Sequence, residues 1–98
     1  MLEIVLSQPI KAHGEEVAQL DLREPTTEDI IACGYPLQIG NGIATPDAGA
    51  VARYIGRLAN IPASSVRQLT PRDFNACMAA ILPFFGDAAP SRSKESAA

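Results

Sequence analysis

The chain has 98 residues, which corresponds to at most one domain. Eight Lys and Arg residues against eleven Asp and Glu residues give a net charge of −3. This balance argues against a nucleic-acid binder or a polybasic membrane anchor, because both need a basic face. No apolar run reaches the ~18 residues of a membrane span. The N-terminus carries Glu3 where a signal peptide carries Lys or Arg, so we expect an intracellular protein.

Two segments with alternating apolar residues, 2–9 and 16–23, predict an antiparallel β-hairpin that closes near His13-Gly14. Pro9 indicates a strand end or an edge, because proline cannot donate a hydrogen bond to the ladder. The alternation gives one apolar face made of Leu2, Ile4, Leu6, Ala18, Leu20 and Leu22.

A first, short helix is expected after Pro25, with Thr26 as its N-cap, Asp29 completing a capping box and Gly34 as its stop. Residues 34–45 are rich in glycine and predict a loop. Within it, Tyr35, Leu37 and Ile39 alternate and could form a short extended segment.

Two further helices begin with the same pattern of Thr, Pro and a nearby acid. Thr45-Pro46-Asp47 predicts a helix that ends at Asn60 and Pro62. A single turn capped by Ser64 could follow. Thr70-Pro71-Arg72-Asp73 predicts the last helix, which Pro83 and Gly86 stop.

The order of elements predicts an α+β fold, in which an N-terminal antiparallel β-hairpin precedes about three α-helices. We expect one domain over residues 1–86 and a disordered tail over 87–98, which holds no large apolar residue. A lone hairpin is marginally stable in water. It must therefore pack on the helices or on another copy of the chain, and Val5 and Ile10 are the candidate residues of an oligomer edge.

No catalytic constellation is visible in the sequence. His13 is the single histidine and lies at the predicted turn, and Cys33 and Cys77 are expected to be reduced core residues. Gly40-Asn41-Gly42 lacks the spacing of a phosphate-binding loop. We therefore expect no enzymatic activity, no cofactor and no metal site.

Three features could serve an interaction with a partner: an edge of the hairpin, the apolar loop 35–43, and the pair Phe84-Phe85. Tyr35, Leu37 and Ile39 are either core residues or partner contacts. The two phenylalanines either fill the core or form an exposed apolar contact surface, because aromatic side chains bury large areas in both settings.

Three segments of the sequence carry a resemblance. The first runs from Ile4 to Ile10 and continues through Gly14 to Leu22-Arg23-Glu24-Pro25-Thr26 and Asp29. The second covers residues 54–73 and contains an Ile-Pro pair and the pattern Leu-Thr-x-x-Asp-Phe. The third covers residues 81–85. Together they resemble the small tail assembly chaperone family of long-tailed phages, in its Mu-like and tail-assembly-protein-E-like branch.

The resemblance implies a non-enzymatic chaperone in the cytoplasm of the bacterial host, which coats the tape measure protein during tail assembly. It also implies a longer form of the same protein, made by a programmed frameshift. Self-association is expected for a different reason, because a two-stranded sheet leaves unpaired edges. We expect the client to bind near Tyr35, Leu37, Ile39 and Phe85. A virion structural tail component and an unrelated small adaptor domain are the alternative functions.

The frameshift can be placed by codon logic. Pro83-Phe84-Phe85 can be encoded as CCT TTT TTT or CCT TTT TTC, and both contain a −1 slip heptamer in the right phase. Both products would then share the sequence up to Phe85 and would differ only after it.

Overall fold

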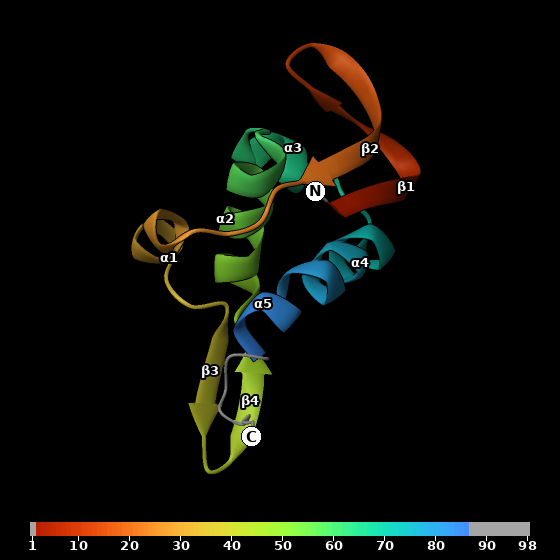
Figure 1. Cartoon of the computed structure of the whole chain (residues 1–98). Coiled ribbons are helices and arrows are strands. Elements are labelled where there is room, and N and C mark those ends of the chain that lie inside the picture. The colour runs from red at the N-terminus through yellow and green to blue at the C-terminus, as the bar shows by residue number, and fades with distance from the viewer. Residues whose placement is uncertain (1, 87–98) are drawn as a thin grey trace.

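The computed structural model describes residues 2–86 and has an α+β fold with two separate antiparallel hairpins and a group of helices (Figure 1). The predicted fold class, an N-terminal hairpin followed by helices, is confirmed. The predicted disorder of residues 87–98 lies outside the described residues. In chain order the elements are β1 (Leu2–Ala12), β2 (Glu15–Leu22), α1 (Thr27–Cys33), β3 (Leu37–Gly40), β4 (Ile43–Pro46), α2 (Ala48–Ala59), α3 (Ala63–Val66), α4 (Pro71–Ile81) and α5 (Pro83–Gly86).

The first hairpin turns at the predicted place. His13 and Gly14 both have positive φ angles, 55° and 79°, as in the two-residue turns that suit the twist of a hairpin. Of the two alternatives for Pro9, a strand end or an edge, the structure has the edge, because β1 continues to Ala12 and pairs only with β2 in its sheet. The ladder shifts register between Val5 and Ile10, and such a bulge accommodates a residue that cannot donate to the ladder.

A buried carboxylate holds this irregular part of β1. The backbone N–H of Ser7 donates to both carboxylate oxygens of Asp73, at 2.9 and 3.0 Å, and the N–H of Gln8 donates to Oδ2 at 3.4 Å. These bonds, the Ser7 bond first, lower the pKa of Asp73 below its ordinary value. Asp73 lies in the first turn of α4, behind the N-cap Thr70, so one side chain joins the bulge to that helix.

A second buried carboxylate organises α1. Asp29 completes the predicted capping box with Thr26 and also binds two guanidinium groups. Arg23 donates from Nη1 at 2.7 Å and from Nη2 at 2.9 Å, and Arg57 of α2 donates from Nε at 2.9 Å. These bonds, the Arg23 bond first, hold the pKa of Asp29 well below its ordinary range. Asp29 therefore both starts α1 and docks it on α2.

Two helix starts differ from the prediction. The N-cap of α2 is Asp47, whose carboxylate accepts from the N–H of Ala50, and not Thr45, which belongs to β4 with Pro46. The start of α3 is Pro62, with no side-chain cap, in place of Ser64. The first error arises because Thr45 and Asp47 both satisfy the capping preference. The second arises because Ser64 satisfies it too, although α3 begins without any side-chain cap.

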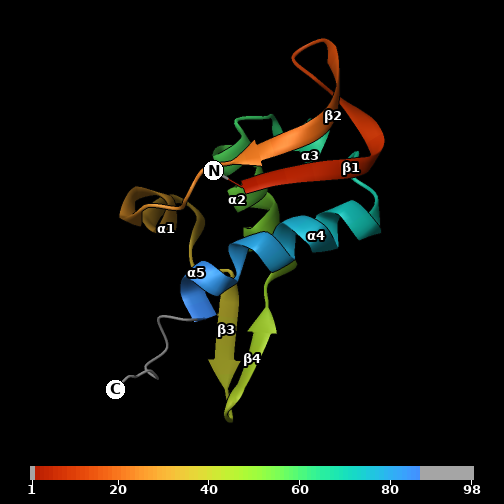
Figure 2. The ribbon, with the colours of Figure 1, turned by 45° about the vertical axis from the view of Figure 1, so that its right-hand side comes forward.

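The loop predicted over residues 34–45 is largely a second hairpin, β3–β4. Asn41 and Gly42 form its turn with φ angles of 53° and 77°, the geometry for which an Asn-Gly pair is the strongest sequence signal. Both ribbon views show this hairpin extending away from the body, on the side opposite to β1 and β2 (Figures 1 and 2). We call residues 37–46 the arm.

The core surrounds α2, which contacts β2, α1, α3 and α4. The two cysteines, Cys33 and Cys77, are free and buried within it, and burial raises the pKa of the Cys77 thiol to about 11. No helix within residues 2–86 is long and apolar enough to cross a membrane. The buried hydrophobic cluster comprises Leu6, Ile10, Leu20, Leu22, Cys33, Val51, Tyr54, Ile55, Leu58, Val66, Cys77 and Ile81.

Candidate partner-binding surface

The chain between α1 and the arm is fixed by hydrogen bonds to α2. Gly34 ends α1 with a φ of 80°, in the region that favours glycine, and its carbonyl accepts from the Tyr54 hydroxyl at 2.6 Å. The carbonyl of Cys33 accepts from Arg53 Nε and Nη2 at 3.4 and 3.2 Å. Tyr35 therefore follows a segment whose position α2 determines.

The base of the arm is fixed in the same way. The N–H of Asp47 donates to the carbonyl of Pro36 at 2.8 Å, and Gln38 Nε2 donates to Asp47 Oδ2 at 3.3 Å. Asp47 is also the N-cap of α2. The arm and the central helix consequently share one anchoring residue.

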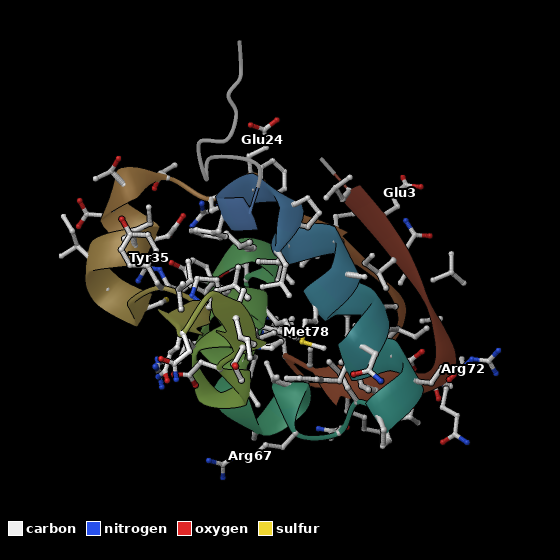
Figure 3. The ribbon with its side chains drawn as sticks, turned by 90° about the horizontal axis from the view of Figure 1, so that it is seen from below. Glu3, Glu24, Tyr35, Arg67, Arg72 and Met78 are labelled. Carbon is white, nitrogen blue, oxygen red and sulfur yellow. The ribbon has the colours of Figure 1, made fainter. Side chains whose placement is uncertain are left out.

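Tyr35 and Phe85, which are 50 positions apart in the sequence, meet through their rings. The ring centroids of these two residues lie 6.2 Å apart at 88°, and those of Phe85 and the buried Tyr54 lie 5.3 Å apart at 64°. Both are edge-to-face arrangements. Phe85 is half-buried, so it partly fills the core and partly supports the exposed Tyr35, whose side chain lies beside α1 in Figure 3.

A shallow groove of about 290 Å³ runs past this pair of rings. Phe84, the other phenylalanine of the pair predicted to fill the core or to contact a partner, is 39% exposed and forms part of the groove wall. The lining residues are Pro25, Thr26, Thr27, Ile30, Tyr35, Phe84 and Phe85. We call this the aromatic groove.

The arm carries apolar side chains on both of its faces. Ile39 pairs with Ala44 and is 74% exposed, whereas Ile43 pairs with Gly40 and is 63% exposed. Their neighbouring positions in the ladder place these two isoleucines on opposite faces. Leu37, at the base of the arm, is half-buried. Exposed β-branched side chains on an uncovered two-stranded sheet are unfavourable in water and suit contact with a partner.

The four predicted contact residues thus form two connected groups. Tyr35 and Phe85 lie at the aromatic groove, while Leu37 and Ile39 lie on the arm that follows it. Ile43 fell only within the predicted 35–43 loop and not among the named contacts. Ile43 directly follows Asn41-Gly42, and this hairpin signal could have identified it as the start of a second strand.

The two predicted edge residues have different environments. Val5 is 75% exposed, whereas Ile10 is 2% exposed and belongs to the core cluster. The choice of Ile10 as an edge contact is therefore corrected, because this side chain lies on the core face of β1 together with Leu6 and Ala12. Ile10 is an even number of positions from Leu2 and Ile4, so the alternation of the strand already places it on their face.

His13 and the two buried carboxylates, which lie outside this surface, have structural partners. His13 is exposed at the turn, with its Nε2 3.0 Å from the carbonyl oxygen of Asn60. Asp29 and Asp73 are buried and each accepts several hydrogen bonds. Within residues 2–86 no group of three His, Cys, Asp or Glu side chains is placed to hold a metal ion.

The match to a protein family covers almost all of the described chain. The family described as phage tail assembly chaperone proteins, E, or 41 or 14, matches residues 3–86. The chain belongs to this family. No curated protein and no solved structure matches it.

The resemblance seen in the sequence is thereby confirmed, and the structure gives the motif residues of this tail assembly chaperone a physical role. Arg23, Thr26 and Asp29 of the first motif form the network at the start of α1. Thr70 and Asp73 of the second motif cap α4 and hold the bulge of β1. These residues stabilise the fold. The arm lies outside the three motif segments, whereas the aromatic groove includes Pro25 and Thr26 of the first and Phe84 and Phe85 of the third.

Proposed function

We propose that this tail assembly chaperone is non-enzymatic and binds the tape measure protein in the host cytoplasm during tail morphogenesis. The observation that carries the proposal is the arm, which holds Ile39 and Ile43 in water on opposite faces. Burial of apolar area contributes about 25 cal/mol per Å² without reading a particular sequence. A long client with many similar segments can be covered in this way.

The aromatic groove supports the same proposal. Tyr35 is 64% exposed but its ring is held against Phe85, so little side-chain freedom is lost when a client packs on it. The groove and the arm follow each other along the chain, and a client segment would contact both.

Co-expression with the tape measure protein tests the proposal. Ile39→Lys should reduce the soluble fraction of the client, because the charge would face the apolar contact. Ile31→Lys is the matched control, since Ile31 is 76% exposed and lies on α1, outside the arm and the groove. Equal effects of the two changes, or no effect of the wild-type protein on client solubility, would contradict the proposal.

Purified virions distinguish the chaperone from a structural tail component. A chaperone should be absent from finished particles, whereas a tail subunit should be detected by mass spectrometry at a fixed ratio to the other tail proteins. Stoichiometric recovery in virions would favour the structural alternative.

We also propose that a longer, frameshifted form shares this domain and takes part in the same assembly. The slip codons fall on α5, where Phe85 packs against Tyr54 and Tyr35. A −1 slip there decodes both phenylalanines before the frames diverge, so both products keep these contacts. Sequencing the gene tests this, because a Pro83 codon that does not end in T, or a TTC codon at Phe84, removes the heptamer.

A further inference from the structure

A second pocket lies against α2 and, unlike the aromatic groove, is rich in positive charge. It has a volume of about 570 Å³ and lies between α2, the end of α1 and the segment that leads into α3. Three arginines and one asparagine line it together with small and apolar residues. The lining residues are Arg23, Ala32, Cys33, Ala52, Arg53, Gly56, Arg57, Asn60, Ile61 and Ala63.

The three arginines of this pocket carry more positive charge than Asp29, the buried carboxylate beside two of them, can balance. Asp29 accepts from both Arg23 and Arg57, and its side chain is 1% exposed, while theirs are 40% and 41% exposed. One carboxylate therefore faces two guanidinium groups. Only Nε of Arg57 makes a hydrogen bond within the described residues, which leaves both of its terminal nitrogens as donors for a ligand.

Arg53 adds a further positive charge. Its Nε and Nη2 donate to the carbonyl of Cys33, which positions the guanidinium group without neutralising it. Arg53 and Arg57 are four positions apart on α2, so their side chains are neighbours on one face of the helix. The pocket thus presents two oriented guanidinium groups at the spacing of one helical turn.

Such a concentration of arginines is unusual in an acidic protein. The chain carries a net charge of −3. An adjoining hollow of about 240 Å³ shares Arg53 with the pocket and adds a fourth arginine, Arg67. The cationic residues between positions 2 and 86 are Lys11, Arg23, Arg53, Arg57, Arg67 and Arg72. Half of them, Arg23, Arg53 and Arg57, line the pocket.

We infer that this pocket binds an acidic helical segment of a partner protein through paired glutamate carboxylates. Arginine binds carboxylates through two parallel hydrogen bonds. Glutamates at positions i and i+4 of a partner helix have the same spacing as Arg53 and Arg57. The small side chains of Ala32, Ala52 and Ala63 in the lining let the backbone of that helix come close.

The same observations argue against a nucleic acid as the ligand. A nucleic acid carries a long row of phosphates, and beyond the pocket these would meet a protein with a negative net charge. A short acidic segment with an apolar face matches both the arginines and the uncharged residues of the lining. This site is independent of the proposed client contact on the arm.

Fluorescence anisotropy tests the inference with a labelled helical peptide of about 20 residues that carries i, i+4 glutamate pairs beside alanines. The matched peptide has glutamine at the same positions. We expect the glutamate peptide to bind, the glutamine peptide to bind at least roughly tenfold more weakly, and binding to weaken as salt is raised. Equal binding of the two peptides, or binding of neither, would overturn the inference.

Protein variants locate the site. Arg53→Gln should weaken the glutamate peptide by about tenfold or more, whereas Arg72→Gln should leave it unchanged. Arg72 is exposed at the start of α4 and points away from the body (Figure 3). Ala63→Glu is a second variant for the case in which Arg53→Gln impairs folding, because Ala63 is exposed and a new carboxylate there would compete for the arginines.

Two outcomes would assign the effect elsewhere and overturn the inference. One is an equal loss of binding with Arg72→Gln and Arg53→Gln, which would indicate a general charge effect. The other is displacement of the peptide by a single-stranded oligonucleotide of equal charge at a lower concentration than unlabelled peptide requires, which would indicate a nucleic-acid site.

Discussion

Arg57 Nε donates to Asp29 Oδ1 at 2.9 Å, although the two residues are 28 positions apart. Asp29 is at the same time the third residue of α1 and accepts from the N–H of the N-cap Thr26 at 2.8 Å. One carboxylate therefore closes the capping box and attaches a seven-residue helix to the central helix. A helix this short is not stable by itself in water, so its position depends on such tertiary contacts.

We first predict that Asp29→Ala lowers the free energy of unfolding by at least about 2 kcal/mol. The change removes charge-assisted hydrogen bonds from Arg23 and Arg57 and the cap of α1. Glu28→Ala is the control, because Glu28 is exposed in the same helical turn and should cost less than about 0.5 kcal/mol. Urea denaturation measures both. Equal losses for the two variants would show that the ion network contributes nothing to stability.

The second prediction concerns acid. Asp29 and Asp73 both have folded-state pKa values below their ordinary range, so each contributes stability above the unfolded pKa of about 4. This contribution falls as the pH drops below about 4, because the unfolded state then binds protons that the folded state resists. We expect the urea midpoint to fall steeply between about pH 4 and pH 2.

Asp73→Asn should flatten part of that pH dependence, since the amide does not titrate and can still accept from Ser7. Asp21→Asn is the control, because Asp21 is exposed on β2. A pH profile of the urea midpoint that is the same in the Asp73 variant and the wild type would rule out Asp73 as a source of the acid sensitivity.

The sequence predicted most reliably the features that depend on a few neighbouring residues. The His13-Gly14 turn and the capping box of Thr26 and Asp29 are local signals, and both occur as expected. The hydrogen-bond partners of Asp29 and Asp73 that are distant in the sequence could not be predicted from neighbouring residues. Arg57 follows Asp29 by 28 positions and Ser7 precedes Asp73 by 66, so only the tertiary fold brings them together.

The third prediction concerns the two thiols. Cys77 is fully buried with a thiol pKa of about 11, and Cys33 is also buried with a raised pKa. The thiolate is the reactive form, so iodoacetamide at pH 8 should modify the folded protein slowly and the urea-unfolded protein quickly. Intact-mass spectrometry follows the reaction. Fast modification of both thiols without denaturant would contradict the buried placement.

The environment of the candidate contact residues could not be read from residue type. The alternation of Tyr35, Leu37 and Ile39 predicts an apolar extended segment but leaves core and partner contact open. In the structure, Tyr35 packs against Phe85 and is still 64% exposed, whereas Ile39 is 74% exposed opposite Ala44 on a two-stranded sheet. The arm itself was missed because glycines suggested a loop, although Asn41-Gly42 is a hairpin signal.

The last prediction separates folding from self-association on β1. We propose that copies of the chain associate through the part of β1 near Val5, because β1 pairs only with β2 and a two-stranded sheet leaves unpaired backbone groups. Val5→Lys should leave the melting temperature within a few degrees, because the side chain is 75% exposed. It should nevertheless lower the average mass measured by light scattering at high concentration. Ile10→Ala should instead destabilise the monomer by about 2–5 kcal/mol, because its side chain is 2% exposed within the core. A wild-type protein that is monomeric at every concentration, or a Val5→Lys variant that associates as strongly as the wild type, would exclude this edge as the contact between copies.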